Sequence, residues 1–183
     1  MKTVRRNLLA LICLGVLILL LTNSSLFAQD KSSGTEERHF WANVGGGGSW
    51  VRSGLGEDEG GISGGISFSY QTGSNLFSIR GVENEEFKLD LFGYTGPPDK
   101  VWDMGVLYGR VAKASWGLAS ISAGVGLVGI SHNDISSYHL GIPIESQLFW
   151  TPISTLGVGI YGFANLNSEK SFVGALLCLQ IGK

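Results

Sequence analysis

A serine, a histidine and a glutamate between positions 137 and 145 are the residues of this chain best suited to hydrolysis. Ser137, His139 and Glu145 are separated by even numbers of residues, so on a strand their side chains share one face. A serine nucleophile needs a base within hydrogen-bond reach and a third group that orients the base. Glu145 follows His139 by six residues, or about 20 Å along a strand, which is too far for that third contact. We therefore predict no catalytic residues and expect the protein not to be an enzyme.

Other residues with chemical potential lack the spacing that a site requires. The three histidines have no metal-ligand pattern, and the acidic run 57–59 lacks the ligand spacing of a calcium loop. The glycine run 45–48 is not followed by the Lys-Ser or Lys-Thr of a phosphate-binding loop. Cys178 is the single cysteine beyond the N-terminal segment, so no disulfide forms within the mature chain. We expect no metal and no cofactor.

Alternation of apolar and polar residues is the main signal after residue 38. Between residues 61 and 71, apolar and small polar residues fall on opposite faces of a strand. The two sets are Ile62, Gly64, Ile66, Phe68 and Tyr70 against Ser63, Gly65, Ser67, Ser69 and Gln71. A soluble strand usually turns Lys and Glu toward water, whereas a transmembrane barrel strand turns an apolar face to lipid and a polar face to the lumen. Charged residues make up 15% of the chain, against about 25% in an ordinary globular protein, which favours the barrel.

Eight such runs predict eight strands, and no window after the N-terminal segment has helical periodicity. They span 39–51, 61–71, 76–92, 101–110, 114–130, 138–149, 156–165 and 171–182. Short connections alternate with longer or more polar ones, as periplasmic turns alternate with external loops in outer-membrane barrels. The longer set is 52–60, 93–100, 131–137 and 165–170. The sequence therefore predicts an all-β fold, an eight-stranded antiparallel up-and-down transmembrane β-barrel with both termini in the periplasm.

Aromatic and charged residues indicate how the strands lie in a membrane. Aromatics gather near the short turns like an interfacial girdle: Trp41, Tyr70, Phe77, Tyr108, Trp116 and Trp150. Of the charged residues after position 38, only three lie in the middle of strands, and parity places all three on the inward face: Arg80, Asp103 and Glu145. A charge away from bulk water must be paired or hydrogen-bonded. We therefore predict a lumen charge network with an Arg80–Glu145 pair, and Asp103 as the alternative acceptor.

The first residues have the form of a secretory signal. Lys2, Arg5 and Arg6 precede the unbroken apolar run 8–21, which is shorter than the roughly 20 residues of a transmembrane helix. We expect cleavage after Ala28, so that 1–28 is a signal peptide, 29–38 a short periplasmic segment and 39–183 the barrel. Export then places the chain in the outer membrane of a Gram-negative bacterium.

At the level of architecture the mature region resembles the small OmpX/OmpA-type outer-membrane barrels. The resemblance rests on strand count, loop alternation and the signal, whereas the C-terminal Ile181-Gly182-Lys183 departs from the aromatic ending usual in such barrels. It implies a monomer whose partners are outer-membrane lipids and the barrel-insertion machinery. Ser137, His139 and Glu145 also resemble the His, Ser and downstream Glu of the lipid A deacylases, although here the serine precedes the histidine. A lipid-modifying enzyme is therefore one alternative, and a narrow channel or a carrier of a small apolar ligand is another.

The external loops are the expected site of function. They are acidic, and the sequence has no basic cluster with interleaved aromatics, so we expect no nucleic-acid partner. Phe87, Leu89 and Leu91 continue the outward parity of the third predicted strand, with charged residues between them. This pattern predicts a ribbon that projects beyond the membrane with an apolar stripe, suited to strand addition by a partner. We expect a structural or surface-interaction role with a cell-surface protein or glycan.

Overall fold

The computed structural model describes residues 38–53, 58–86, 100–132 and 135–182, which form eight strands and the turns between them. No helix among the described residues is long and apolar enough to cross a membrane. The strands are β1 (Arg38–Ser53), β2 (Asp58–Thr72), β3 (Asn75–Glu86), β4 (Lys100–Ala114), β5 (Gly117–His132), β6 (Ile135–Ile153), β7 (Leu156–Asn167) and β8 (Lys170–Gly182).

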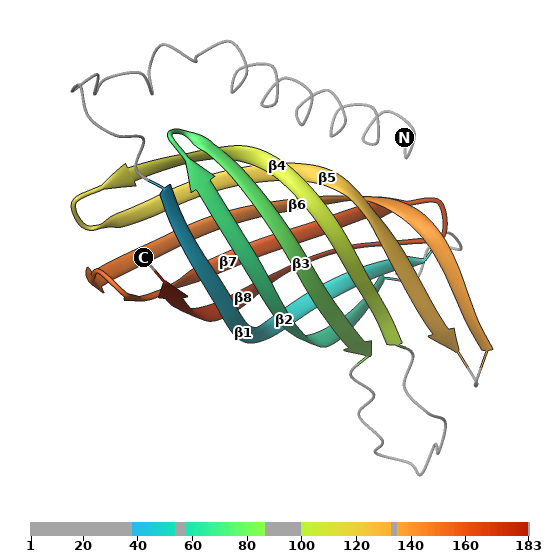
Figure 1. Ribbon diagram of the computed structural model, residues 1–183. Helices are drawn as coiled ribbons and strands as arrows, with labels where there is room; N and C mark the ends of the chain where they lie inside the picture. The colour runs from blue at the N-terminus through green and yellow to red at the C-terminus, as the bar shows by residue number, and fades with distance from the viewer. Residues whose placement is uncertain (1–37, 54–57, 87–99, 133–134, 183) are drawn as a thin grey trace, which may run out of the picture. The chain divides into compact units, whose positions relative to one another are not determined.

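The strands form one closed antiparallel barrel in which each strand pairs with its neighbours in sequence and β8 pairs with β1 (Figure 1). This topology confirms the predicted up-and-down barrel. Because every strand has a partner on each side, the sheet has no open edge along its middle section. Closure is the condition that lets a sheet cross hydrocarbon, where an unpaired backbone group costs several kcal/mol.

The register around the barrel fixes its geometry. The row of paired residues that starts at Phe40 on β1 returns to β1 at Trp50, an offset of ten residues. The row runs through Tyr70, Phe77, Tyr108, Ala123, Ile144, Ala164 and Val173. With eight strands, an offset of ten tilts the strands by about 40° from the barrel axis. The interior of so small a barrel is just wide enough for side chains.

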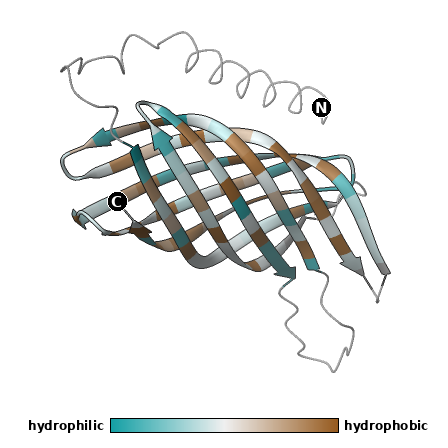
Figure 2. Ribbon diagram, viewed as in Figure 1, coloured by the Kyte–Doolittle hydropathy of each residue, from teal (hydrophilic) through white to brown (hydrophobic). Residues whose placement is uncertain are grey.

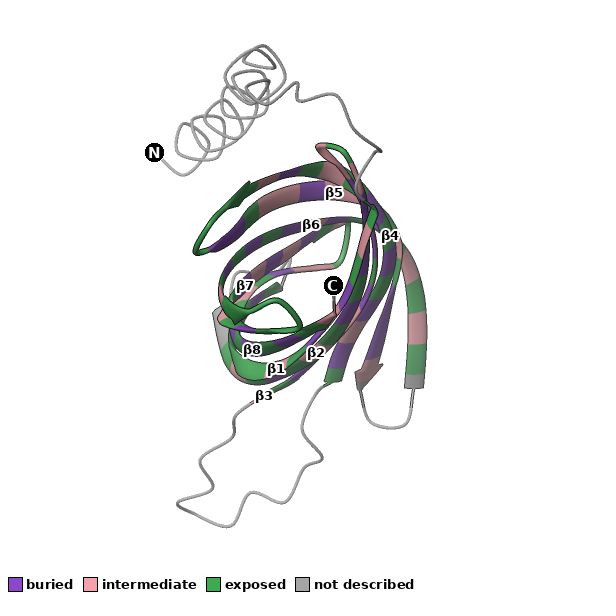
Figure 3. Ribbon diagram, turned by 60° about the vertical axis from the view of Figure 1, so that its left-hand side comes forward, coloured by how far each residue is buried: buried purple, intermediate pink, exposed green. Residues whose placement is uncertain are grey.

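Hydropathy and burial alternate along the strands, as the ribbon colours of Figures 2 and 3 show, which is the pattern of side chains that point in turn to the surface and to the lumen. On β2 the predicted parity is confirmed, because Ile62, Ile66 and Phe68 are exposed whereas Ser63 and Ser67 are buried. Large exposed hydrophobic side chains occur on all eight strands. Phe40 and Trp50 are both exposed and lie ten residues apart on β1, which at a tilt of about 40° corresponds to a band about 25 Å tall. That height matches the lipid-facing band of outer-membrane barrels.

Exposed aromatic residues flank this band at both ends. The predicted girdle near the short turns is present, but the prediction is wrong for Trp41. Trp41 is buried in the lumen, and the neighbouring Phe40 faces outward in its place, stacked on Phe68 at a centroid distance of 6.5 Å. At the opposite end, Trp102 and Tyr138 form an edge-to-face pair at 6.1 Å. Side chains of this kind sit at headgroup level in membranes.

Two glycines allow β1 to approach β8 closely. A Cβ atom at Gly45 or Gly47 would overlap the β8 backbone, so only glycine fits these inward positions. Gly46 and Gly48 have ordinary space around them. The glycine run is thus a packing feature at the closing seam. At the β2–β3 hairpin, Gly73 has φ 58°, which favours glycine in a two-residue turn.

The strands extend further into the predicted external loops than expected. β5 and β6 pair as far as His132↔Ile135, and β7 and β8 are joined by only two residues. Two of the four predicted long loops are therefore as short as the turns at the opposite end. β3 is described to Glu86 rather than to residue 92, and the predicted ribbon of Phe87, Leu89 and Leu91 lies outside the described residues.

The topology predicts which positions a membrane-impermeant thiol reagent reaches in whole cells. Ser168 and Ser74 lie in connections at opposite ends of the barrel, and Cys178 is buried and should give little background. A Ser168→Cys variant should label in intact cells, whereas Ser74→Cys should label only after the outer membrane is permeabilised. Labelling of position 74 in intact cells would reverse the orientation.

Candidate functional site

Arg80 lies at the centre of a hydrogen-bonded network inside the barrel and is only 1% exposed. Its guanidinium donates to Asp103 Oδ2 at 2.6 Å, forming a fully buried ion pair. It also donates to the backbone carbonyls of Ile144 at 2.7 Å and Ala164 at 2.8 Å. Asn165 donates to the same Asp103 oxygen at 2.8 Å. One arginine therefore connects β3, β4, β6 and β7 across the lumen.

Glu145 is buried as predicted, but Arg80 forms its ion pair with Asp103, the alternative acceptor. The Tyr161 hydroxyl donates to Glu145 Oε2, and Gln147 donates to Glu145 Oε1 at 3.2 Å. Register explains the choice of partner. Asp103 lies on the strand next to Arg80, opposite Val82, and is within reach of the long arginine side chain. Glu145 instead accepts a hydrogen bond from Tyr161 on β7, the strand next to its own.

A second part of the network fills the barrel toward the end with the β2–β3, β4–β5 and β6–β7 turns. Gln147 accepts from Trp41 Nε1 at 3.1 Å and from Asn43 Nδ2 at 3.2 Å. Asn43 also donates to Ser67 at 3.0 Å, and Gln147 donates to Ser69 at 3.4 Å. These bonds tie β1 and β2 to β6 on the far side of the lumen. Together with Glu145 they satisfy polar groups that would otherwise be buried without partners.

Apolar side chains close the lumen above and below this network. Leu76 and Phe149 are completely buried toward the end with the β2–β3 turn. Phe163 and Phe172 are buried toward the opposite end, with ring centroids 6.2 Å apart. An open channel would expose these inward-facing side chains to water. Their burial indicates that side chains fill the lumen on both sides of the network, as expected for a barrel of this size.

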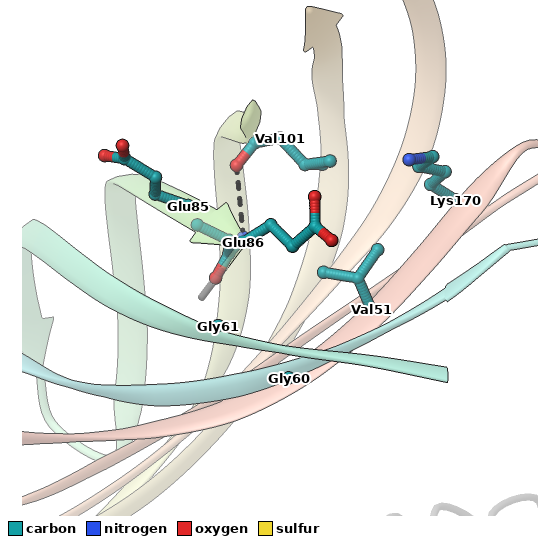
Figure 4. Close-up of a pocket in the computed structure, with 8 residues that line it drawn as sticks. Val51, Gly60, Gly61, Glu85, Glu86, Val101 and Lys170 are labelled. Atoms are coloured by element: carbon teal, nitrogen blue, oxygen red, sulfur yellow. Dashed lines mark hydrogen bonds between the residues drawn. The ribbon is translucent and has the colours of Figure 1, made fainter. Parts of the chain in front are cut away.

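A small pocket lies at the end of the barrel opposite the β2–β3, β4–β5 and β6–β7 turns (Figure 4). Its volume is about 10 Å³, enough for roughly one water molecule. Glu86 and Lys170 approach it from opposite walls, and the buried Asn84 amide donates to the Val101 carbonyl at 3.2 Å. The pocket is too small for an organic ligand.

Ser137 and His139 are in contact, but without the glutamate. The His139 Nε2 atom lies 3.2 Å from Ser137 Oγ, on the inward face of β6. Glu145 lies further along the same strand and is bound to Tyr161 and Gln147. The described residues thus contain a serine–histidine contact but do not bring Glu145 to it. They also contain no cluster of His, Cys, Asp or Glu that could hold a metal ion.

Sequence reasoning missed several members of the lumen network. Tyr161, Asn165 and Gln147 were not singled out, although each is buried and bonded to a charged residue. Parity carries the signal for all three. Each alternates with exposed apolar neighbours, such as Ile160 beside Tyr161, and would have been assigned to the lumen by the same rule that assigned Arg80.

Comparison of the fold supports the architecture. No protein-family model matches the sequence, and no curated protein matches it either. Among solved structures, Neisserial surface protein A superposes with a TM-score of 0.61 at 12% identity, over 78% of this chain and 96% of that one. Ail, the attachment invasion locus protein of Yersinia pestis, superposes with a TM-score of 0.59 at 10% identity, over 80% of this chain and 99% of that one. This chain has the fold of the small outer-membrane β-barrels.

Replacing Arg80 with methionine should lower the free energy of unfolding by about 3–5 kcal/mol, because Asp103 is left as a buried charge without its partner. The double variant R80M/D103N should lose less than the sum of the single variants, by about 0.5–3 kcal/mol. Urea unfolding of the barrel refolded in lipid vesicles measures this cycle. The matched control is R80M/E145Q, which should be closer to additive because Tyr161 and Gln147 hold Glu145. An additive Arg80/Asp103 cycle would contradict the central role of the pair.

Proposed function

We propose that this protein is a non-enzymatic outer-membrane barrel that acts through contacts at its external end. The observation that carries the proposal is the packed lumen, which argues against a channel or a carrier of a small apolar ligand. A barrel with an apolar outer band and a filled interior has only its two ends left for contact with soluble partners. The acidic external end is the one that faces the surroundings of the cell.

Several features of the chain support this location. We infer that residues 1–28 direct export, that 29–38 are a short periplasmic segment, and that the barrel inserts as a monomer through the insertion machinery. The exposed apolar side chains would then face outer-membrane lipids. Arg38 and Arg110 lie exposed at the end with the β2–β3 turn. Glu83 and Glu85 lie exposed near the other end, where both form ion pairs with Lys100. This polarity fits a periplasmic and an external end.

The charge of the external end bears on the kind of partner. The segments 52–60, 83–100, 131–137 and 165–170 contain ten acidic and four basic residues. One of the structures of similar fold is Ail in complex with a heparin analogue, sucrose octasulfate. A polyanion of that kind would be repelled by the acidic end of this barrel. We therefore favour a cell-surface protein over a sulfated glycan, with the ribbon of Phe87, Leu89 and Leu91 among the contact candidates.

A lipid-modifying enzyme is the second candidate, and one observation favours it. The 3.2 Å contact between Ser137 and His139 is within the range of a nucleophile and its base. The missing acid argues against it, because Glu145 is held by Tyr161 and Gln147. The alternative makes a distinct prediction about lipid A, so the two candidates can be separated in one strain set.

Deletion of residues 87–92 should reduce attachment of cells to a protein-coated surface, while the lipid A mass spectrum stays unchanged. The comparison set is the parent strain, a full deletion of the chain, the 87–92 deletion and a Ser137→Ala variant. Attachment assays and lipid A mass spectrometry on the same cultures give both readouts. A lipid A species that depends on Ser137 would overturn the non-enzymatic proposal. Unchanged attachment after full deletion would remove the surface-interaction role.

A further inference from the structure

Arg110 lies on the outward face of β4, at the end of the barrel with the β2–β3 turn. It is exposed and follows the exposed Tyr108 by two residues, so both side chains point to the same face. Asn75 on β3 pairs with Arg110 in the ladder, as Phe77 pairs with Tyr108. At a strand tilt of about 40°, Asn75 and Arg110 lie within about 5 Å of the height of Phe40, at the end of the apolar band. They therefore lie at the level where lipid headgroups meet acyl chains.

Two hydrogen bonds hold these side chains so that their remaining donor groups are available. Arg110 Nη1 donates to Ser74 Oγ at 2.8 Å, so the hydroxyl proton of Ser74 can be donated to another acceptor. The Tyr108 hydroxyl donates to Asn75 Oδ1 at 2.8 Å, which leaves the N–H groups of the Asn75 amide available. The other guanidinium N–H groups of Arg110 donate to no described residue. Ser74, Asn75 and Arg110, here called the Arg110 corner, thus present donors from three neighbouring side chains.

The charge around the Arg110 corner is positive. Arg38 and Lys113 are also exposed at this end, and the described residues here include no Asp or Glu. The carboxylates of the described strands lie in the lumen or toward the opposite end. A group of donors in a positive field attracts an anion. The planar fork of an arginine matches a phosphate with two parallel hydrogen bonds, so a phosphate group is the anion that fits the corner best.

An apolar path leads from the Arg110 corner along the lipid-facing surface. The rings of Phe77 and Tyr108 pack beside the corner at a centroid distance of 5.2 Å, and the next outward pair is Ile79 and Val106, both exposed. An acyl chain attached to a phosphate at the corner would lie over these side chains. We propose that the Arg110 corner binds the phosphodiester of an anionic glycerophospholipid in the periplasmic leaflet of the outer membrane. The proposal rests on the proposed function, which places this end in the periplasm.

The charge at this end also selects the part of the headgroup beyond the phosphate. The ammonium group of phosphatidylethanolamine would be repelled by Arg110, and the described residues at this end offer it no carboxylate as a partner. Phosphatidylglycerol carries only hydroxyl groups beyond its phosphate, so its net negative charge is not offset. The lipid that fits is therefore of the phosphatidylglycerol type, with one negative charge and an uncharged polar end.

Native mass spectrometry of the mature barrel tests the site, because each bound molecule is identified by its mass. The barrel is released from detergent micelles that contain phosphatidylglycerol and phosphatidylethanolamine with identical acyl chains, together with ammonium phosphate. Phosphatidylglycerol should bind first, and Arg110→Gln should weaken this binding by about tenfold through loss of a charge-assisted hydrogen bond. The matched control is Arg38→Gln, which removes the same charge from the same end. It should change the affinity less than about twofold, because three strand spacings, about 14 Å, separate β1 from β4 and exposed charges are screened over that distance.

Two further variants separate a built site from a general attraction to positive charge. Asn75→Leu should weaken phosphatidylglycerol binding by about fivefold although no charge changes, and Arg110→Lys should restore only part of the affinity, because lysine lacks the fork. Equal binding of the two lipids, or equal losses in Arg38→Gln and Arg110→Gln, would overturn the proposal.

Two other outcomes would also overturn the proposal, and each would reassign the site. A phosphate adduct in place of a lipid would assign the corner to free phosphate. Labelling of a cysteine at position 74 in intact cells would move the corner to the outer leaflet and exclude a periplasmic lipid. The binding measurement uses purified protein, so phosphatidylglycerol binding beside unchanged cell attachment would remove the proposed surface role and leave the lipid site.

Discussion

Closure of the sheet is the constraint on which the rest of this structure depends. Hydrocarbon offers no hydrogen bonds, so the backbone groups of every membrane-crossing strand must be satisfied by neighbouring strands. Pairing of β8 with β1 provides the final contact, and Gly45 and Gly47 provide the room for it. The offset of ten residues at closure sets the strand tilt, and the tilt with the strand number sets the radius. Neither the radius nor the lumen contents can then vary independently.

The narrow radius explains why the interior is both polar and solid. Charged side chains face inward because the lipid face would penalise them by a few kcal/mol each. Once inside, they are shielded from bulk water and must be paired or hydrogen-bonded, as Arg80 is paired with Asp103 and Glu145 is hydrogen-bonded by Tyr161. The pairing fills the volume that a pore would need. A packed interior moves any functional contact to the ends of the barrel, where strand lengths are no longer dictated by the bilayer.

Most of the fold follows from the sequence because the constraint acts on every residue of a strand. Parity alone places Ile62 outside, Ser63 inside and Arg80 in the lumen. The prediction for Trp41 is wrong because it rests on closeness to a turn and not on parity. Parity with the outward Phe40, one residue earlier, places Trp41 in the lumen. The acceptor of Arg80 depends on register between strands and on competition from Tyr161, neither of which one strand reveals. The sequence of residues 135–140 does not reveal that β6 starts there without pairing to β7, because this results from the end of β7 at Asn167.

The seam between β1 and β8 also has a kinetic consequence. Trp41 and Gly182 are paired neighbours although their residue numbers differ by 141. Contacts of such large sequence separation slow folding, because the chain loses its loop entropy before the contact forms. Until the seam closes, two long strands carry open edges that template aggregation. Once it has closed, no middle strand can leave without breaking ladders on both of its sides. Folding of the barrel is therefore slow and unfolding is slower still. How long the folded barrel lasts in the membrane depends on its unfolding rate as much as on its equilibrium stability.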